Sequence, residues 1–98
     1  MDFEWDPTKA AANLKKHGVS FDETTSVFGD PLALTFGDPD HSGSEDRLIT
    51  FGLSLQGRLL VVSHTPRDPR IRIVNARPMI RRERKIYEIG RASCRERV

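Results

Sequence analysis

The chain has little of several features that mark large classes of protein. Its single cysteine, Cys94, excludes an internal disulfide and a cysteine-rich zinc site. Its longest purely apolar run, residues 59–62, is far shorter than the roughly 20 residues of a membrane-spanning helix. The opening residues MDFEWD are acidic and contain no apolar stretch of the kind found in secretory signals. The 98 residues therefore predict one small domain in the cytoplasm, without a membrane segment.

The last ten residues, IGRASCRERV, resemble the translation of a sequencing-library adapter joined after Glu88. We therefore expect a single domain over residues 1–88 and a non-native tail over residues 89–98. The whole chain has 16 basic and 14 acidic residues, but three arginines and one glutamate belong to the tail, and without them the chain has 13 of each. Local clusters of arginine are therefore better evidence for a nucleic-acid partner than the overall charge.

The hydrophobic pattern predicts an α+β fold: an antiparallel sheet of about four strands with two N-terminal helices and one C-terminal helix. Asp6-Pro7 suits the start of the first helix, and Gly18 suits its end. Ser20 and Glu23 form a capping-box pattern at the start of the second helix. The expected strands cover residues 3–5, 32–36, 47–55, 58–64 and 70–76, and the expected helices cover residues 7–17, 21–28 and 78–88.

The later strands follow one another with short links, which favours an antiparallel meander. Residues 65–69, with two prolines, are expected to form a stiff loop. Strand 47–55 is expected to place four apolar side chains on one face: Ile49, Phe51, Leu53 and Leu55.

The segment Arg70–Glu88 joins an alternating strand to a short basic helix that Pro78 is expected to open. The strand half is expected to point Ile71 and Ile73 to one face, and Arg72, Val74 and Ala76 to the other. The helix half is expected to have one mainly apolar face, made of Met79, Ile80, Glu83, Ile86 and Tyr87. Six arginines in this segment indicate either a phosphate-binding site or a solvated helix face, and both interpretations stay open here.

Three segments of the chain resemble the BrnT toxins, which are ribonucleases of type II toxin–antitoxin systems with a RelE-like fold. The segments are WDPTKAAANLKKHGVSF (residues 5–21), EDRLITFGLSLQGRLLVVSHTPR (45–67) and IRIVNARPMIRRERKIYE (71–88). Their order and spacing cover most of the chain up to Glu88. Asn75 stands where the family usually has serine, and Pro78-Met79 stands where it has a polar residue followed by alanine. These departures leave the local structure at the start of the last helix open.

The resemblance implies a cytoplasmic toxin that cleaves RNA and thereby inhibits translation. It also implies a cognate antitoxin of the ribbon-helix-helix type, which would neutralise the toxin and bind operator DNA for the complex. The expected assembly is a toxin–antitoxin hetero-oligomer, in which an antitoxin dimer bridges two toxins.

Cleavage of RNA without a metal requires a base for the 2′-hydroxyl, stabilisation of the charge at phosphorus, and assistance to the leaving 5′-oxygen. A polar loop over residues 37–46 contains four possible metal ligands, Asp38, Asp40, His41 and Glu45. Such loops are more often only solvated, because ligands without rigid flanks have poor coordination geometry. We therefore expect no cofactor and a metal-independent reaction.

His17 is the first candidate for the acid or base, because imidazole can give or take a proton near neutral pH. The alternative is a histidine at a helix C-terminus that interacts only with the helix dipole and its cap. His64, at the end of a strand, is a second candidate, with a partly exposed cross-strand residue as the alternative. His41 is expected on the surface of the polar loop.

Arginine side chains are candidates for binding phosphate, because guanidinium donates hydrogen bonds in a planar fork. The expected catalytic residues are His17, Arg67, Arg72, Arg77 and Glu83. The expected RNA-binding residues are Lys9, Lys16, Arg47, His64, Arg81 and Arg82. An ion pair with Arg72 or Arg77 is an equally good explanation for Glu83. Trp5 and Tyr87 could stack on bases, although packing is the more common fate of such residues.

Three functions remain possible from the sequence. The first is the ribonuclease toxin, and the second is a non-catalytic module of the same fold that binds RNA or protein. A direct DNA-binding repressor is weaker, because no helix-turn-helix or ribbon-helix-helix pattern is present, and DNA contact is expected only through the antitoxin.

Overall fold

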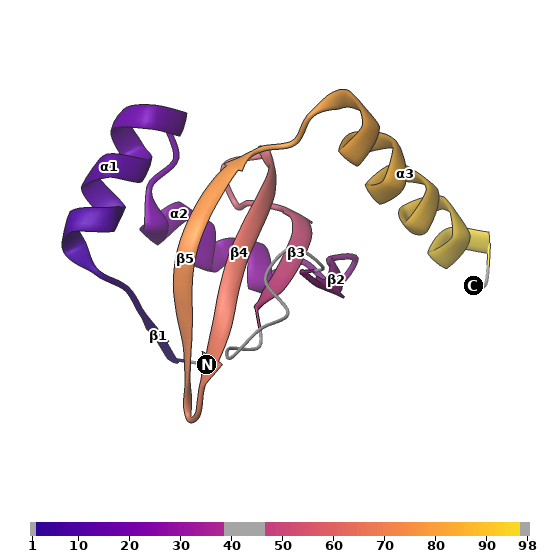
Figure 1. Cartoon of the computed structure of the whole chain (residues 1–98). Helices are drawn as coiled ribbons and strands as arrows, with labels where there is room; N and C mark the ends of the chain where they lie inside the picture. Colours follow the sequence, from indigo (N-terminus) through magenta and orange to yellow (C-terminus); the bar gives the residue numbers. More distant parts are fainter. Residues whose placement is uncertain (1, 39–46, 97–98) are drawn as a thin grey trace.

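The computed structural model describes residues 2–38 and 47–96, and the side chains up to residue 90. A five-stranded sheet with strand order β1-β5-β4-β3-β2 forms its centre (Figure 1). In chain order the elements are β1 (Asp2–Glu4), α1 (Pro7–His17), α2 (Phe21–Thr25), the 3-10 helix η1 (Ser26–Gly29), β2 (Leu34–Gly37), β3 (Leu48–Leu53), β4 (Leu59–Arg67), β5 (Arg70–Pro78) and α3 (Arg81–Glu96). The predicted α+β class is confirmed.

The sheet differs from the expected one at its N-terminal edge. β2, β3, β4 and β5 form the predicted antiparallel meander, but β1 pairs with β5 in parallel, and the sheet is therefore mixed. β1 ends at Glu4, so Trp5 lies outside the strand in which it was expected.

Two apolar cores cover opposite faces of the sheet. On one face, Val19, Phe21 and Val27 from the α1–α2 turn, α2 and η1 pack with four sheet residues, Leu60, Val62, Ile73 and Ala76. On the other face, Met79 and Tyr87 of the C-terminal segment pack with Phe51 and Val61. α1, α2 and η1 therefore belong to one layer, and α3 packs over the opposite side near β2 and β3.

The starts and ends of the first two helices follow the expected local chemistry. The backbone N–H of Thr8 donates to Asp6 Oδ1 at 2.8 Å, and Gly18 ends α1 with φ 69°, a conformation that glycine adopts without a steric penalty. Ser20 caps α2 by accepting from the N–H of Glu23 at 3.1 Å. The capping box is only half formed, because the Glu23 carboxylate accepts hydrogen bonds from Arg58 and Ser54 instead of from the backbone of Ser20.

β5 contains the main error of the strand prediction. Ser63 pairs with Asn75 and His64 pairs with Ile73, so Val74 is an extra residue that forms a β-bulge. The bulge changes the alternation, and Ala76 lies in the same core as Ile73 instead of on the opposite face. The expectation that Ala76 points away from Ile73 was therefore wrong.

The ends of three other elements also differ from expectation. β4 continues to Arg67, so the predicted loop over residues 65–69 shrinks to a tight hairpin. Pro78 ends β5 and does not open α3, because the N–H of Met79 still donates to Leu59 O at 3.0 Å and keeps the chain in the sheet. Leu55 lies beyond β3 with 91% of its surface exposed, so it does not share the core of Phe51.

Three possible metal ligands of the polar loop, Asp40, His41 and Glu45, lie outside the described residues.

The Asn13 side chain supplies hydrogen-bond partners for the backbone at the edge of the sheet. β1 pairs only with residues 70–72, so the outer edge of β5 has no strand partner at Ala76. The Asn13 side chain accepts from Ala76 N at 3.1 Å and donates to Ala76 O at 2.9 Å, as a neighbouring peptide group would. It also donates to Val19 O at 2.9 Å, and it is buried. This one amide therefore fixes α1 against β5 and against the turn that follows α1.

We predict that Asn13→Ala lowers the free energy of unfolding by about 2–4 kcal/mol, because three buried backbone groups lose their partner. Lys9→Ala, at an exposed position of the same helix, is the matched control and should change stability by less than about 0.5 kcal/mol. Urea titrations of the two variants and the parent protein measure the difference. Equal stability of both variants would contradict the role given to Asn13.

Candidate functional site

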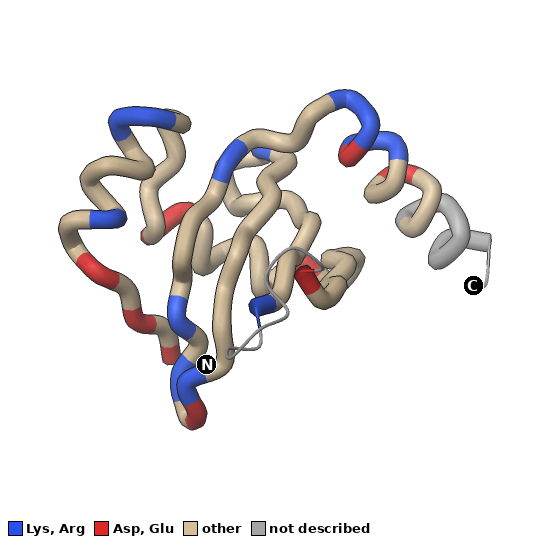
Figure 2. The backbone as a smooth tube through the Cα atoms, in the orientation of Figure 1, with Lys and Arg blue, Asp and Glu red and all other residues tan. Residues whose placement is uncertain are grey.

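Basic side chains gather at two opposite ends of the sheet. The first group, which we name the cationic rim, lies where α1 ends, β5 ends and α3 begins (Figure 2). The second group, which we name the hairpin end, lies at the β4–β5 turn and at β1. The cationic rim consists of Lys15, Lys16, His17, Arg77, Arg81 and Arg82, and the hairpin end consists of Arg67, Arg70 and Arg72 with Asp2, Glu4 and Asp68.

His17 belongs to the cationic rim because Asn13 sets the position of α1. His17 lies one helical turn after Asn13, whose side chain bonds to the backbone of Ala76, next to Arg77. The His17 side chain is half-buried, whereas those of Lys15 and Lys16 are exposed. The end of α1 therefore presents an imidazole and two ammonium groups at the end of β5 that carries Arg77.

Arg77 is held in one orientation by Glu83. Its Nη1 donates to Glu83 Oε1 at 2.7 Å, and its Nη2 donates to Glu83 Oε2 at 2.8 Å. The Ile80 N–H also donates to Glu83 Oε1, at 2.9 Å, so the same carboxylate caps the start of α3. The hydrogen bonds that Arg77 donates lower the pKa of Glu83, and the same bonds raise the pKa of Arg77. Glu83 thus has the ion-pair role that the sequence allowed, with Arg77 as the partner.

The predicted catalytic residues do not form one cluster. His17, Arg77 and Glu83 lie at the cationic rim, whereas Arg67 and Arg72 lie at the hairpin end. Four residues lie between Arg72 and Arg77, and the five residue steps separate their backbones by about 16 Å along the strand. A single phosphate cannot bind at both ends at once.

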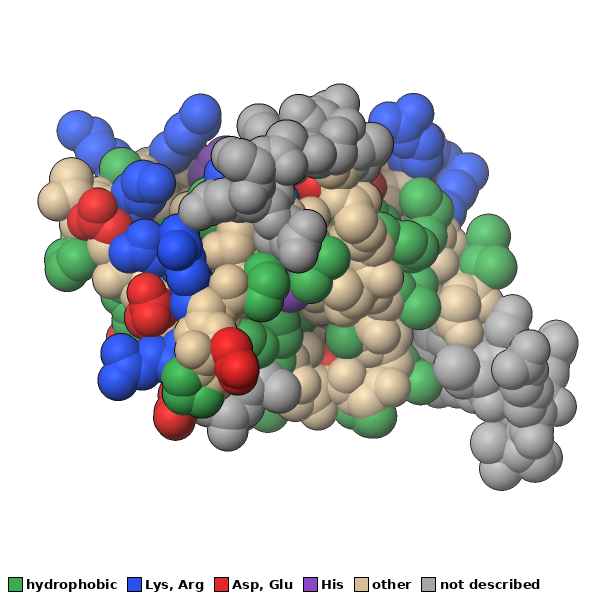
Figure 3. Space-filling view, turned by 60° about the horizontal axis from the view of Figure 1, so that its bottom comes forward, with side chains coloured by type: hydrophobic (Ala, Val, Ile, Leu, Met, Phe, Trp, Pro, Cys, Tyr) green, Lys and Arg blue, Asp and Glu red, His purple; other side chains and the backbone are tan. Residues whose placement is uncertain are grey.

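The hairpin end mixes charges of both signs. Arg72 Nε lies 3.3 Å from Glu4 Oε2, and Arg70 Nη1 lies 4.0 Å from Glu4 Oε1. In the space-filling view, acidic side chains lie among the basic ones at this end (Figure 3). Arg72 therefore also ties β5 to β1, and the net charge of the hairpin end is small.

His64 does not contact solvent, in contrast to its expected place among the RNA-binding residues. The side chain is buried, and 5% of the residue surface is exposed. Its Nε2 lies 2.7 Å from Thr50 Oγ1, and its ring meets that of Phe28 edge-on at a centroid distance of 4.9 Å. Desolvation lowers the pKa of His64 from 6.5 to about 4. His64 is therefore an uncharged core residue near neutral pH.

The two aromatic side chains that were considered for base stacking are used in packing. Trp5 meets Phe21 in an edge-on arrangement at 5.9 Å. Tyr87 is buried, and its hydroxyl donates to Asp30 Oδ2 at 2.7 Å.

Lys9 is exposed, about 12 Å along α1 from His17. Arg47 precedes β3, toward the hairpin end of the sheet.

Comparison with known proteins assigns the fold and the family. The sequence model of one protein family matches residues 5–83, and that family is described as the ribonuclease toxin BrnT of type II toxin–antitoxin systems. The chain belongs to the BrnT family. The structure is similar to the crystal structure of the Brucella abortus ribonuclease toxin BrnT, with a TM-score of 0.66 and 20% sequence identity. The alignment covers 83% of this chain and 99% of the Brucella protein, so the two share a fold.

Among curated proteins, no sequence matches the chain. Within residues 2–38 and 47–96, no helix of this BrnT-family protein is long and apolar enough to cross a membrane.

Sequence reasoning missed Arg58, which adjoins the cationic rim. Arg58 precedes β4, and its Nη2 donates to Gly18 O, directly after His17, at 2.9 Å. The same guanidinium binds the buried carboxylate of Glu23. A weak signal was available, because Glu23 lies on a helix face between apolar residues and a carboxylate there needs a cationic partner.

The burial of His64 makes a prediction about the pH dependence of stability. The folded protein protonates His64 only near pH 4, whereas an unfolded chain does so near pH 6.5. Between these values the unfolded state binds more protons, so the free energy of unfolding falls as the pH is lowered. His64→Gln should remove this contribution of His64 to the pH dependence of the free energy of unfolding, which amounts to about 3 kcal/mol at most.

Denaturant titrations of both proteins between pH 7 and pH 4 provide the measurement. The carboxylates are the same in both proteins, so the difference between the two pH profiles belongs to His64. Parallel profiles would show that His64 can be protonated in the folded state.

Proposed function

We propose that this BrnT-family protein is a metal-independent endoribonuclease whose reaction takes place at the cationic rim. The observation that carries this proposal is that a half-buried histidine, an oriented arginine and four exposed basic side chains all lie at one end of the sheet. The family to which the chain belongs is described as a ribonuclease toxin. The matched residues, 5–83, lie within the toxin domain that we assign to residues 1–88.

The reaction consists of an attack by the 2′-hydroxyl oxygen on the adjacent phosphorus and release of the 5′-oxygen. The products are a 2′,3′-cyclic phosphate and a free 5′-hydroxyl. His17 supplies proton transfer, since an imidazole can take the 2′-hydroxyl proton or give one to the leaving oxygen. Arg77 stabilises the charge that develops on the phosphate, and Glu83 keeps its guanidinium in place.

The other basic side chains act on the RNA backbone. Lys16, Arg81 and Arg82 bind phosphates beside the reacting one, where their exposed charges attract the strand. Farther from the reaction, the RNA strand that follows β5 contacts Lys9, Arg47, Arg67 and Arg72. We place His64 in the core and outside the RNA-binding residues.

In the cell, cleavage of RNA by this toxin would inhibit translation in the cytoplasm. A cognate antitoxin of the ribbon-helix-helix type would neutralise it by covering the cationic rim, and operator DNA would bind through the antitoxin. The complex would be a hetero-oligomer in which an antitoxin dimer bridges two toxins. The alternative is a module that binds RNA or protein through the same rim without cleaving.

Cleavage of an end-labelled single-stranded RNA in EDTA tests the proposal. The parent protein should leave 2′,3′-cyclic phosphate ends, and His17→Ala should lower the rate by about 100-fold or more because a proton-transfer group is lost. Thr8→Ala, at an exposed position near the start of the same helix, is the control and should retain most of the activity. Binding of RNA without cleavage by the folded parent protein would favour the non-catalytic module.

A second measurement locates the RNA by the salt dependence of binding. A 2′-O-methyl oligonucleotide cannot react through its 2′-oxygen and therefore reports binding alone. The plot of log affinity against log salt should lose about 0.7 of its slope for each phosphate contact removed by Arg81→Ala or Arg82→Ala.

The matched control for these two variants is Arg70→Ala at the hairpin end. The Arg70 side chain is also exposed but lies near Glu4. It should leave the slope nearly unchanged. An equal loss of slope in all three variants would show that the RNA does not favour the cationic rim.

A further inference from the structure

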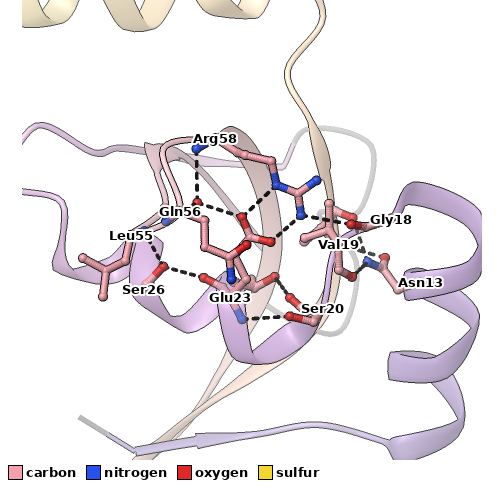
Figure 4. Close-up of polar contacts among 12 residues, drawn as sticks. Asn13, Gly18, Val19, Ser20, Glu23, Ser26, Leu55, Gln56 and Arg58 are labelled. Carbon is pink, nitrogen blue, oxygen red and sulfur yellow. Dashed lines mark hydrogen bonds and ion pairs between the residues drawn. The ribbon is translucent and has the colours of Figure 1, made fainter.

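An ion pair between the buried carboxylate of Glu23 and Arg58 connects α2, the residue before β4 and the residue after His17 (Figure 4). The Glu23 carboxylate is 2% exposed and accepts from Arg58 Nε at 2.9 Å and from Ser54 Oγ at 2.8 Å, both at Oε2. Its Oε1 accepts from Arg58 Nη2. The same Nη2 also donates to Gly18 O at 2.9 Å. One guanidinium therefore holds a carboxylate from α2 and a backbone carbonyl from the end of α1.

Both partners of this pair are charged in the folded protein. The hydrogen bonding from Arg58 to Glu23 lowers the pKa of Glu23 against the opposing effect of burial, and the same interaction raises the pKa of Arg58. A buried carboxylate without a partner costs several kcal/mol, so Arg58 cannot leave Glu23 without a large loss of stability. The position of the guanidinium is consequently fixed.

The turn after His17 is held from two sides. The carbonyl of Gly18 accepts from Arg58, and the carbonyl of Val19 accepts from Asn13 at 2.9 Å. The N–H of Gly18 donates to Leu14 O at 2.9 Å and closes the last turn of α1. The backbone on the C-terminal side of His17 therefore has little freedom. The backbone atoms from which the His17 side chain extends are consequently held in place.

We propose that Glu23 and Arg58 are positioning residues for His17. This inference rests on the proposed function, because it assigns to the pair the task of placing the proton-transfer group of the cationic rim. Stability alone does not require the contact with Gly18, since Glu23 already accepts hydrogen bonds from Arg58 and Ser54. The additional bond to Gly18 O directs the ion pair toward the end of α1.

Arg58 could instead touch the RNA, because 41% of its side chain is exposed. The bonds to Glu23 and Gly18 argue for the positioning role, since they occupy Nε and Nη2 and pair the charge with a carboxylate. The two roles differ in what they do to the kinetics. A lost positioning residue lowers kcat, whereas a lost RNA contact raises KM.

The test compares Arg58→Lys and Glu23→Gln with Ser54→Ala as the matched control. Lysine keeps the charge but cannot reproduce the fork that reaches both Glu23 and Gly18. Ser54→Ala removes a hydrogen bond to the same buried carboxylate without touching Gly18. We expect kcat to fall by about 10- to 100-fold in the first two variants with KM nearly constant, because a displacement of about 1 Å has effects of this size. The control should keep kcat close to that of the parent protein while losing a similar amount of thermal stability.

Double variants separate positioning from a general loss of structure. If Arg58 acts through His17, then Arg58→Lys should lower kcat no further in a His17→Ala protein. If the reductions in kcat from the two changes multiply in the double variant, the inference is overturned in favour of a structural role. A rise in KM alone would overturn it in favour of an RNA contact. An effect of Ser54→Ala equal to that of Arg58→Lys would also overturn it.

A spectroscopic measurement keeps the inference separate from the proposed function. The ring signals of His17 in NMR spectra are identified by their loss in His17→Ala. These signals should shift in Arg58→Lys and Glu23→Gln but stay in place in Ser54→Ala. If His17→Ala leaves RNA cleavage unchanged, the catalytic role of His17 fails and the inference fails with it. If His17→Ala abolishes cleavage while Arg58→Lys changes neither kcat nor the His17 signals, only the inference is overturned.

Discussion

The unpaired outer edge of β5 is the constraint on which the arrangement of this protein depends. β1 covers that edge only beside residues 70–72, and farther along the strand a buried N–H and C=O would be left without partners. The Asn13 amide binds both groups at Ala76 and thereby takes the place of a sixth strand. This contact holds α1 against β5 near Ala76, and the two elements end on the same side of the molecule (Figure 1). A helix and a strand that are 63 residues apart at this contact thus bring His17 and Arg77 to the same end of the sheet.

Two carboxylates determine how the basic side chains near this end are used. Glu83 orients Arg77 and caps α3, and Glu23 orients Arg58, which binds the Gly18 carbonyl in the turn after α1. In each case the acid is better shielded from solvent than its arginine, so the acid fixes the arginine in place and the guanidinium remains accessible. The exposed lysines of α1 and arginines of α3 have no such fixed orientation and supply positive potential. The cationic rim therefore combines an oriented arginine with exposed charges that can attract a polyanion.

The sequence predicted what depends on near neighbours and missed what depends on distant ones. The cap at Asp6, the glycine end of α1 and the α+β class follow from local chemistry and hydrophobic period, and the structure confirms them. The bulge at Val74 depends on the register with β4, and it moved Ala76 to the other face. The burial of His64 depends on Phe28, and the choice of Arg77 over Arg72 as the partner of Glu83 depends on where α3 turns back. None of these contacts leaves a periodic pattern in the sequence.

The difference between the two ends of the sheet is the strongest physical reason to place the chemistry at the cationic rim. Both ends carry arginines, but those of the hairpin end are interspersed with Asp2, Glu4 and Asp68, and their fields largely cancel at the distance at which RNA approaches. At the rim, the acid that pairs with Arg77 orients it, and exposed lysines and arginines surround that pair. A polyanion is therefore drawn to the end that also holds a half-buried imidazole. Under the proposed function, attraction and proton transfer would occur at the same end of the sheet, as a metal-free cleavage of RNA requires.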